Sequence, residues 1–444
     1  MPLHSRPFQL PNELAIHYLY ENICYKKPAH LEHNLPLWDR VSQSIASASP
    51  RLRLPLSIRS RPRRIIFIAG TLDGCRYDFS KIIPFLRTLA KLRTIEFAGL
   101  EIPLTFFTEL DTIPEILHLR MHKARLPVLP THSVLHNTRL TSLEIERTLH
   151  IPFSLLSLPT LRVLKLSWDA DIARAFGTWI RGSPITRGGQ LREVASETGH
   201  RSLPPLEEVH IEARAAREER QAMNCNLWLF LRACSASLQS IRTNDYGSIF
   251  LYGPPVSFPN LHTYIGTSCL GDMFGTQIFK GNSSLRVVKF NDEPYGDILL
   301  RVFGYNSDPP TPPYGIRKLE IRNLDEFDQY LNGFPDFLRD MFPNLEEFYC
   351  GPSTSIHWDE EFFTNLGSTH LSKMTKLRRF VIHPCNEPDI DEWKPDIGTL
   401  IRQWGKCAPA LRVVSLARHY EWERASSDAE WVEWELEWKY TTFY

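Results

Sequence analysis

The sequence predicts an α/β solenoid, a linear array in which short parallel strands alternate with helices. A hydrophobic phrase of the form Leu-x-x-Leu-x-Leu recurs from about residue 92 to residue 416. Several copies follow a proline, and stretches with helical patterning lie between them. Successive copies start between 21 residues (Leu140 to Leu161) and 48 residues (Leu92 to Leu140) apart. Such periods are typical of repeat arrays in which each unit packs only on its neighbours.

Eleven aligned copies of the phrase each predict one short strand. In the last pair of the phrase a polar or variable residue separates two apolar ones, which is the period-two pattern of a strand with a single buried face. The copies begin at Leu92, Leu140, Leu161, Leu206, Leu238, Leu261, Leu285, Ile316, Leu345, Leu377 and Leu411. A weaker copy stands at Leu117 and Leu119, and a first strand is expected at residues 64–69.

Proline marks the boundary between a helix and the next strand. It stands in Leu-Pro-Thr-Leu at 158–161, in Phe-Pro-Asn-Leu at both 258–261 and 342–345, and in Ala-Pro-Ala-Leu at 408–411. A proline at this point stops a helix and fixes the entry into the strand. Helices are expected at residues 228–236, 334–341, 360–374 and 397–406.

The pattern resembles the leucine-rich-repeat family over roughly three quarters of the chain. The resemblance implies a horseshoe with a parallel sheet on its concave side and helices on its convex side. The family's asparagine, three places after the third apolar residue, is nearly absent, and residues such as Leu100, Asp169 and Cys385 stand there instead. We therefore expect an irregular array of variable repeat length without a regular asparagine ladder.

The composition is that of an ordinary globular protein. The 444 residues are 43% hydrophobic and 23% charged, which is enough to build a substantial core. Fifty-one basic residues balance 51 acidic ones, so the formal net charge is zero. This balance disfavours a general nucleic-acid or anionic-membrane binder, and any recognition by charge is expected to be local.

The cysteines and the apolar runs predict an intracellular protein, cytoplasmic or nuclear. The eight cysteines show no paired spacing, which favours reduced structural thiols over a disulfide framework or a metal site. No stretch approaches the roughly 20 apolar residues of a membrane span. The N-terminus lacks the apolar core of a signal peptide.

The first fifty residues differ from the repeats and predict two short helices. Pro11 suits a first helical turn, with Asn12 and Glu13 favourable at a helix N-terminus. Leu14 and Tyr18 then share a face at i, i+4 spacing. A second amphipathic stretch occupies residues 37–52 and is ended by a proline.

This segment resembles the F-box, the small helical module that docks a substrate receptor onto the Skp-type adaptor of a cullin-RING ubiquitin ligase. Residues 10–14 match the family's opening Leu-Pro-x-Glu-Leu, and residues 45–52 are similar to the ending of many fungal F-box proteins that carry leucine-rich repeats. The match departs at Tyr18, where isoleucine is expected, and at Asn22, where an apolar residue is usual. The resemblance implies an adaptor-binding surface made of Leu10, Pro11, Glu13, Leu14, Tyr18, Leu19 and Ile23.

Two interpretations of this N-terminal segment stay open. A terminal repeat must cover its apolar face, so the same helices would also serve as a plain cap on the solenoid. The order of modules, a small helical head followed by leucine-rich repeats, favours the F-box. We expect three parts, namely a helical F-box-like module at 1–55, the solenoid at 56–417 and an aromatic capping segment at 418–444.

The residue between the last two apolar positions of each phrase is expected to point outward from the sheet. This set contains Glu96, Glu144, Lys165, His210, Arg242, Ile265, Lys289, Glu320, Tyr349, Val381 and Ser415. A protein partner with mixed charge and an apolar anchor would suit such a surface. We predict substrate contacts from Lys165, His210, Arg242, Lys289, Glu320 and Tyr349.

The C-terminal segment predicts a hairpin that seals the last repeat. Tyr420, Trp422, Trp431, Trp434, Trp438 and Tyr440 alternate with charged residues over most of the stretch. A turn is expected at Ser426 to Asp428, because the run of strand-favouring residues is broken there.

The usual catalytic signatures are missing from the sequence, including phosphate-binding glycine loops, nucleophile elbows and paired Cys-x-x-Cys motifs. We therefore predict a non-enzymatic protein with no cofactor and no bound metal. The resemblance implies the substrate-recognition subunit of an SCF-type ubiquitin ligase, with a Skp-type adaptor, a cullin complex and an unidentified protein substrate as partners. The alternative is a leucine-rich-repeat scaffold for protein–protein interaction without a link to ubiquitin.

Overall fold

The computed structural model places most of the chain in two compact units, the N-terminal unit (residues 1–211) and the C-terminal unit (residues 212–444), and we describe each by itself. The residues that it describes are 21–36, 62–69, 77–113, 115–126, 139–148, 153–181, 203–213, 220–243, 256–267, 279, 282–291, 299, 302–304, 314–321, 334–353, 360–384, 390–417 and 420–435.

The N-terminal unit is built on a parallel sheet whose strands follow one another in chain order. Its strands are β1 (Asn22–Tyr25), β2 (Arg64–Ile68), β3 (Thr94–Ala98), β4 (His118–His122), β5 (Ser142–Glu146) and β6 (Val163–Trp168), and β7 (Glu208–Ala213) crosses the boundary between the units. Each strand from β1 to β5 pairs in parallel with the next. This one-dimensional strand order is that of a solenoid.

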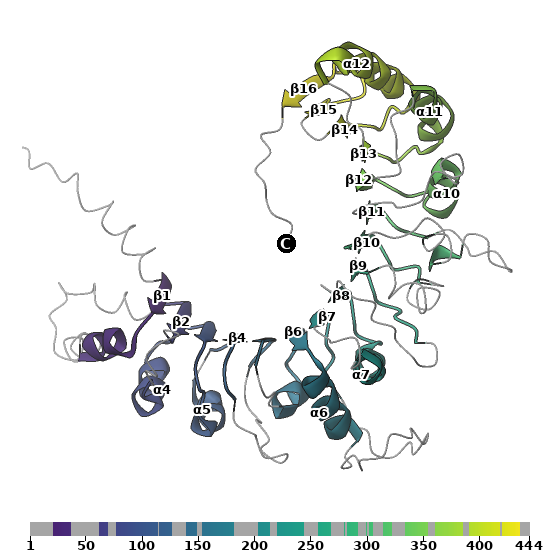
Figure 1. Ribbon diagram of the computed structural model, residues 1–444. Coiled ribbons are helices and arrows are strands. Elements are labelled where there is room, and N and C mark those ends of the chain that lie inside the picture. Colours follow the sequence, from purple (N-terminus) through teal and green to yellow (C-terminus); the bar gives the residue numbers. More distant parts are fainter. Residues whose placement is uncertain are drawn as a thin grey trace, which may run out of the picture. The chain divides into compact units, whose positions relative to one another are not determined.

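Helices cover one side of this sheet (Figure 1). They are α4 (Phe79–Arg87), α5 (Leu104–Glu109), η1 (Leu110–Thr112), η2 (Phe153–Ser157) and α6 (Ala170–Arg181), and residues 28–36 are also helical. Side-chain caps start two of them, since Asp78 accepts a hydrogen bond from the Ser80 amide at 3.0 Å and Asp169 accepts one from the Ile172 amide at 2.8 Å.

The core lies between the helices and the inward side chains of the strands. Phe67 stacks on Tyr25 and Phe97, with ring centroids 5.7 and 5.5 Å away. Phe97 in turn meets Phe106 of α5 edge-on at 5.0 Å. Phe67, Phe97 and Phe106 are fully buried. Burying a side chain of this size contributes about 1.5–3 kcal/mol, so the repeated apolar phrase accounts for both the strands and their attachment to the helices.

The C-terminal unit is also built on a parallel sheet, but its last strands are antiparallel. Its parallel strands, each paired with the next in this order, are β8 (Ser240–Thr243), β9 (Thr263–Gly266), β10 (Val287–Phe290), β11 (Lys318–Ile321), β12 (Glu347–Ser353), β13 (Arg379–Pro384) and β14 (Val413–Ala417). Strands β15 (Tyr420–Glu423) and β16 (Val432–Glu435) form an antiparallel hairpin on β14. The hairpin therefore ends the parallel progression.

The helices of the C-terminal unit again lie on one side of its strands (Figure 1). They are α7 (Arg220–Cys234), α10 (Phe334–Met341), α11 (Glu360–Asn365), the π-helical turn η5 (Leu366–His370), η6 (Leu371–Lys373) and α12 (Ile390–Cys407). Trp404 of α12 is buried, meets Phe380 of β13 edge-on at 5.8 Å and donates a hydrogen bond to the Phe363 carbonyl at 3.0 Å.

One backbone device joins successive repeats in both units. Just before each of eleven described strands, a single carbonyl accepts the amides of two consecutive residues of the next repeat. The Arg93 carbonyl, for example, accepts the Leu117 and His118 amides at 2.9 Å each. The same double acceptance occurs at the carbonyls of Arg63, Leu117, Thr141, Arg162, Gln239, His262, Arg286, Arg317, Glu346 and Arg378. These bonds fix where each strand starts against its neighbour.

Arginine side chains brace the turn that enters three of the strands. Arg162, Arg286 and Arg412 follow directly after the first leucine of their phrases. Each donates through Nη1 to the carbonyl three residues earlier, at 2.7, 2.6 and 2.6 Å, and to the carbonyl of that leucine. Charge-assisted bonds of this kind satisfy carbonyls that the turn leaves outside the sheet.

Left-handed turns stand where the family's asparagine ladder would begin. Gly99, Lys123 and Arg147 follow β3, β4 and β5 with φ of 71°, 50° and 52°. Gly99 and Lys123 donate their amides to the carbonyls of His122 and Glu146 in the next strand. The asparagine positions themselves hold buried side chains, namely those of Leu100, Ala124 and Thr148. The predicted absence of a regular asparagine ladder is confirmed for these repeats.

Most predicted strands and helices are present, with four corrections. The weak phrase at Leu117 and Leu119 is one residue out of register, because the buried residues are Ile116, Leu119 and Met121. The helices expected at 228–236 and 397–406 begin earlier, at Arg220 and Ile390. The helix expected at 360–374 is broken into α11, η5 and η6.

The fourth correction concerns the N-terminal segment. A purely helical module was expected at 1–55, but Asn22–Tyr25 forms β1, in register with β2 from Asn22↔Arg64 to Tyr25↔Phe67. Tyr25 is buried. Residues 22–25 therefore belong to the sheet, and the boundary at residue 55 stays a prediction.

Candidate functional site

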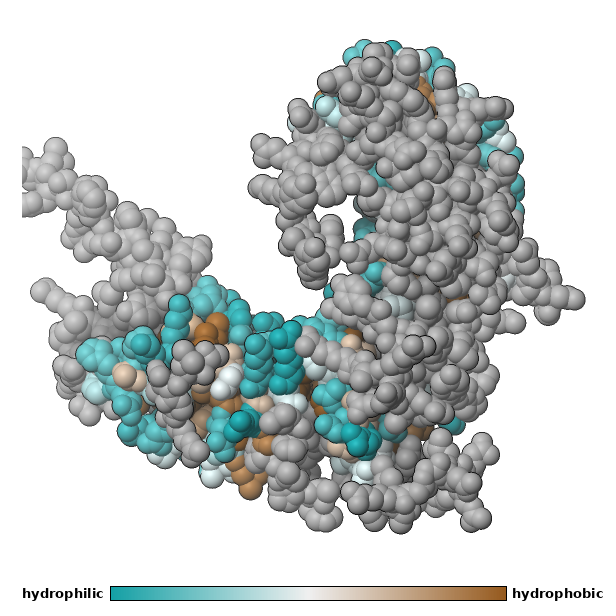
Figure 2. Space-filling model, in the orientation of Figure 1, coloured by the Kyte–Doolittle hydropathy of each residue, from teal (hydrophilic) through white to brown (hydrophobic). Residues whose placement is uncertain are grey.

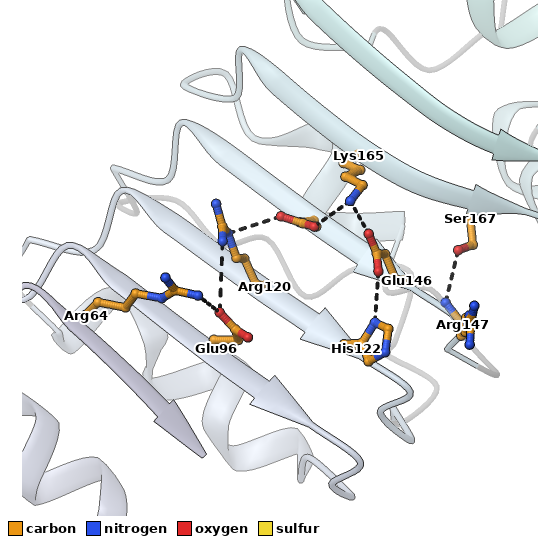
Figure 3. A network of polar contacts seen from close by, with 9 residues as sticks. Arg64, Glu96, Arg120, His122, Glu146, Arg147, Lys165 and Ser167 are labelled. Atoms are coloured by element: carbon orange, nitrogen blue, oxygen red, sulfur yellow. Dashed lines mark hydrogen bonds and ion pairs between the residues drawn. The ribbon is translucent and has the colours of Figure 1, made fainter. Parts of the chain in front are cut away.

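The outward face of the N-terminal sheet carries an ordered row of charges, which we call the charge ladder (Arg64, Glu96, Arg120, Glu144, Lys165, Glu146 and His122). These side chains lie on the side of the strands away from the helices (Figure 3). Hydrophilic residues gather over this part of the surface (Figure 2). Acid and base alternate from strand to strand along the row.

Ion pairs connect the charge ladder across β2 to β6. Arg64 Nη2 lies 2.5 Å from Glu96 Oε2, and Arg120 Nε lies 3.1 Å from Glu144 Oε2. Lys165 Nζ lies 2.9 Å from Glu144 Oε1 and also pairs with Glu146. Opposite charges directly across neighbouring strands stabilise their pairing.

Glu146 is the most enclosed member of the ladder, with 15% of its side chain exposed. His122 Nδ1 lies 2.8 Å from its Oε2. Burial alone would raise the pKa of Glu146, but the hydrogen bond and charge of Lys165, with the contact from His122, outweigh burial and lower this pKa to about 2. Burial also favours neutral Lys165, yet the two glutamates raise its pKa. Glu146 and Lys165 are therefore both charged at neutral pH.

The outward face of the C-terminal unit carries a second group, which we call the Tyr349 cluster (Lys318, Glu347, Tyr349, Arg379 and Glu421). Lys318 Nζ lies 4.7 Å from the centre of the Tyr349 ring, and the guanidinium carbon of Arg379 lies 5.5 Å from it. Lys318 pairs with Glu347 at 3.1 Å and Arg379 with Glu421 at 2.5 Å. Two cations and two carboxylates thus hold one aromatic ring in place.

The environment of Tyr349 keeps its phenol neutral. Burial raises its pKa, the charge of Arg379 opposes this, and Glu347, whose carboxylate accepts the phenol hydrogen bond at 3.3 Å, raises it further, to about 12. The ring therefore presents apolar surface whose position is fixed by its charged neighbours, which is a property of an anchor in protein interfaces.

The structure brings some of the predicted substrate-contacting residues together. Lys289 and Glu320 form an ion pair, and Glu320 is the register partner of Tyr349 on β12. Lys165 lies in the charge ladder. His210 is half-buried on β7, and Arg242 is exposed on β8 beside Ile265.

Two members of the predicted outward set do not face solvent. Val381 is 8% exposed and Ser415 is 2% exposed. The Ser415 hydroxyl donates to the Tyr420 carbonyl at 3.0 Å and lies 3.0 Å from His383 Nε2. Tyr420 and His383 therefore cover Ser415 at the C-terminal end of the outward row.

The predicted adaptor-binding residues are placed only in part. Leu10, Pro11, Glu13, Leu14, Tyr18 and Leu19 lie outside the described residues. Ile23 lies in β1, half-buried and in register with Ile65. Ile23 therefore lies on a strand and not on the expected helix, and its contact with an adaptor stays a prediction.

Sequence reasoning missed the charged neighbours of the outward row. Arg64, Glu146, Lys318 and Arg379 stand two residues from a middle position on the same strand face. Extending the period-two pattern by one step in each direction would have identified them.

Within the described ranges, no three His, Cys, Asp or Glu side chains are arranged as metal ligands would be. No helix in that part of the chain has the length and apolar character needed to cross a membrane. The two outward groups consist of paired charges and one aromatic ring, an arrangement suited to recognising a complementary surface.

Comparison with known proteins gives limited likenesses. No family model and no curated protein matches the chain. Among solved structures, the crystal structure of a TLR13–ssRNA13 complex is similar over 82% of this chain, with 12% identity and a TM-score of 0.37. A leucine-rich-repeat protein of Leptospira interrogans, LIC12759, is similar over 79% of this chain and 91% of its own length, with 12% identity and a TM-score of 0.27.

The chain spans 44% of the length of the TLR13 structure that it matches. Both TM-scores are below 0.5, so the assignment of a leucine-rich-repeat solenoid rests on the recurring phrase and on the strand order described above.

Proposed function

We propose that this chain, an α/β leucine-rich-repeat solenoid, works as a protein-binding scaffold and holds a protein partner on the outward face of its strands. The observation that carries the proposal is the Tyr349 cluster, in which charged side chains hold an aromatic ring on a rigid strand. Tyrosine and arginine are enriched among residues that dominate binding energy. Side chains fixed by their neighbours lose little freedom on binding.

The charge ladder supports the same function in the N-terminal unit. Its ion pairs orient carboxylates and cations before a partner arrives, and such patterns favour partners of complementary charge over others. Each charge is already balanced by a neighbour on the next strand. We therefore assign to the ladder a role in selecting a partner of the N-terminal unit, and to the Tyr349 cluster a role in the affinity for a partner of the C-terminal unit.

Tyr349→Ala in the full chain tests this proposal by quantitative affinity capture from cells. Proteins retained by the wild type and by the control Arg402→Ala, an exposed arginine on α12, should be lost by Tyr349→Ala. An identical set of retained proteins for all three would refute the assignment of the Tyr349 cluster as a binding surface.

The finer proposal is that the scaffold is the substrate-recognition subunit of an SCF-type ubiquitin ligase. It is supported by the Leu-Pro-x-Glu-Leu match at residues 10–14 and by the position of this match ahead of the repeats. Because residues 22–25 form β1, the helical part of the adaptor contact would come from residues 10–19. Its partners would be a Skp-type adaptor and, through it, a cullin. The chain itself would bring a substrate lysine close to the ubiquitin carrier without performing chemistry.

A pull-down with a purified Skp-type adaptor tests the finer proposal. The double variant Leu10→Ala, Leu14→Asp should lose the adaptor, whereas Leu104→Asp, which places the same charge at an exposed leucine of α5, should keep it. Circular dichroism would establish that both variants are folded. Failure of the wild type to bind would leave the scaffold function without the ubiquitin link.

The cysteines are compatible with a reducing compartment. Cys24, Cys234, Cys350 and Cys407 are free thiols, and burial raises the pKa of Cys234 and Cys350. Such thiols act as small apolar side chains. These thiols support our proposal that the protein works in the cytoplasm or nucleus.

A further inference from the structure

The C-terminal hairpin is anchored on one side, and no strand of the described residues pairs with its other side. On its anchored side Trp422 is buried and pairs in register with Val414 of β14. Arg424 is also buried, and its Nε donates to the Leu411 carbonyl at 2.7 Å. β16 pairs with β15 and is the last strand in the sheet order of the described residues (Figure 1). An edge strand of this kind is a template for a further strand.

Exposed apolar surface is concentrated on β16. Among the described residues only three large hydrophobic side chains are exposed, and two of them are Val432 (51%) and Trp434 (54%). They stand two residues apart on one strand and therefore share a face. No proline and no lysine, which commonly protect exposed edges, stands within Val432–Glu435.

This apolar face continues into the Tyr349 cluster. Trp434 is the register partner of Glu421, and Glu421 pairs with Arg379 at 2.5 Å. Val432 is the register partner of Glu423. The face of the hairpin that exposes the two apolar side chains thus adjoins the outward face that the proposed function already uses.

The hairpin is strongly acidic. Between Tyr420 and Glu435 the sequence contains six acidic residues, Glu421, Glu423, Asp428, Glu430, Glu433 and Glu435, and one basic residue, Arg424, which is buried. A second copy of β16 added at this edge would bring like charges together, which costs stability. A strand whose basic residues alternate with apolar ones would instead meet opposite charge and cover Val432 and Trp434.

We propose that β16 is a docking strand for an extended, basic and apolar peptide segment of a protein partner, which adds to the sheet edge as a further antiparallel or parallel strand. Backbone hydrogen bonds would supply general affinity, and Trp434 with the acidic side chains would supply selectivity. The inference rests on the proposed function in supposing a protein partner, and it names the chemistry and the conformation of the segment that binds.

Hydrogen exchange of the full chain tests this proposal with a defined probe. The probe is a peptide of about ten residues in which arginine alternates with valine and isoleucine, beside an equivalent peptide with glutamate in place of arginine. In the dilute free protein, amides of 432–435 that do not face β15 should exchange fast. The basic peptide should slow them, and the acidic peptide should leave them unchanged.

The affinity of the basic peptide should fall about tenfold in Trp434→Ala, as expected for a buried aromatic anchor. It should fall by less than about twofold in the control Leu104→Ala, which removes the third exposed hydrophobic side chain. Because both altered residues are exposed, each variant should remain folded.

Other occupants of the edge give different outcomes, and each would overturn the proposal. Slow exchange in the dilute free protein would mean that the chain itself covers β16. Protection that grows with protein concentration and disappears in Trp434→Ala would mean a second copy. If the basic peptide does not slow exchange of the amides at 432–435, β16 does not bind this ligand. Binding lost in Tyr349→Ala but kept in Trp434→Ala would overturn the docking strand while leaving the outward-face function intact.

Discussion

The guanidinium of Arg424 lies 4.8 Å from the centre of the Trp431 ring, and this pair fastens the terminal hairpin to the last helix. Arg424 donates to the carbonyls of Gly405 and Ala408 at 3.2 Å each, at the C-terminal end of α12. Burial, reinforced by the charge of Arg412, lowers the pKa of Arg424. The negative end of the helix dipole and the ring face offset this cost for the buried cation.

Replacing Arg424 should loosen the C-terminal end of the solenoid. Arg424→Ala leaves several buried carbonyls without donors, and the free energy of unfolding should fall by about 3 kcal/mol. Arg424→Lys keeps the charge but cannot reach all these acceptors, so it should cost about half as much. Urea denaturation followed by circular dichroism measures both, and a lysine variant as stable as the wild type would contradict the bonding scheme.

Gly367 should not tolerate a side chain. A Cβ at this position would lie 2.0 Å from Trp404 Cδ1, and Trp404 is buried against Phe380. Gly367→Ala should therefore lower the free energy of unfolding by about 2 kcal/mol. Gly398→Ala is the matched control, because its nearest neighbour is the flexible end of Arg402 at 3.7 Å. That change in α12 should be neutral or stabilising by up to about 1 kcal/mol.

The left-handed turns predict opposite effects of glycine and alanine. Lys123 and Arg147 adopt positive φ at a cost that glycine does not incur, so Lys123→Gly and Arg147→Gly should each raise the free energy of unfolding by about 1 kcal/mol. Gly99→Ala should lower it by a similar amount, although its Cβ would meet only ordinary contacts at 3.5 Å or more. Thermal melting of the three variants tests this, and destabilisation by both glycine changes would show that side-chain contacts dominate there.

Acid should weaken the charge ladder through Glu146. Its pKa is lowered from 4.5 to about 2 in the folded protein, so its contribution is complete above about pH 4.5 and is lost as the pH falls toward 2. Glu146→Gln should therefore reduce the free energy of unfolding by about 2 kcal/mol at pH 7. The difference from wild type should shrink between pH 4.5 and 2, whereas Glu115→Gln, at an exposed residue, should match the wild type throughout. A pH-independent difference would rule out this origin.

The strands were predictable because a buried apolar pair repeats at a fixed position in each phrase. Leu143 with Ile145 and Leu164 with Leu166 are fully or almost fully buried, as the pattern requires. The weak phrase was placed one residue late at its first position because Ile116 and Leu117 are both apolar, and burial of Ile116 is what distinguishes them. Strand β1 was not predicted because it pairs with β2, which lies about forty residues further along the chain. Such a pairing cannot be inferred from the local sequence of either strand.

The binding surfaces were predictable only along their central row. Spacing identified Lys165, Glu320 and Tyr349, but Arg379 and Glu421 meet through an antiparallel return that the repeat template does not contain. The aromatic residues of the last segment were expected to seal the final repeat. Trp422 does so, whereas Trp434 points away and is 54% exposed. Alternation alone identifies two faces and does not say which one is covered.

The shared carbonyls at the repeat junctions restrict where the chain can gain or lose residues. Each junction ties two consecutive amides to one acceptor, so a single codon inserted within a strand would break the registry with both neighbouring repeats. Codons added between the end of one strand and the start of the next leave every junction intact and cost little in loop-closure entropy. Lineages of this protein should therefore vary in length between strands and conserve the number of residues from each junction to the end of its strand.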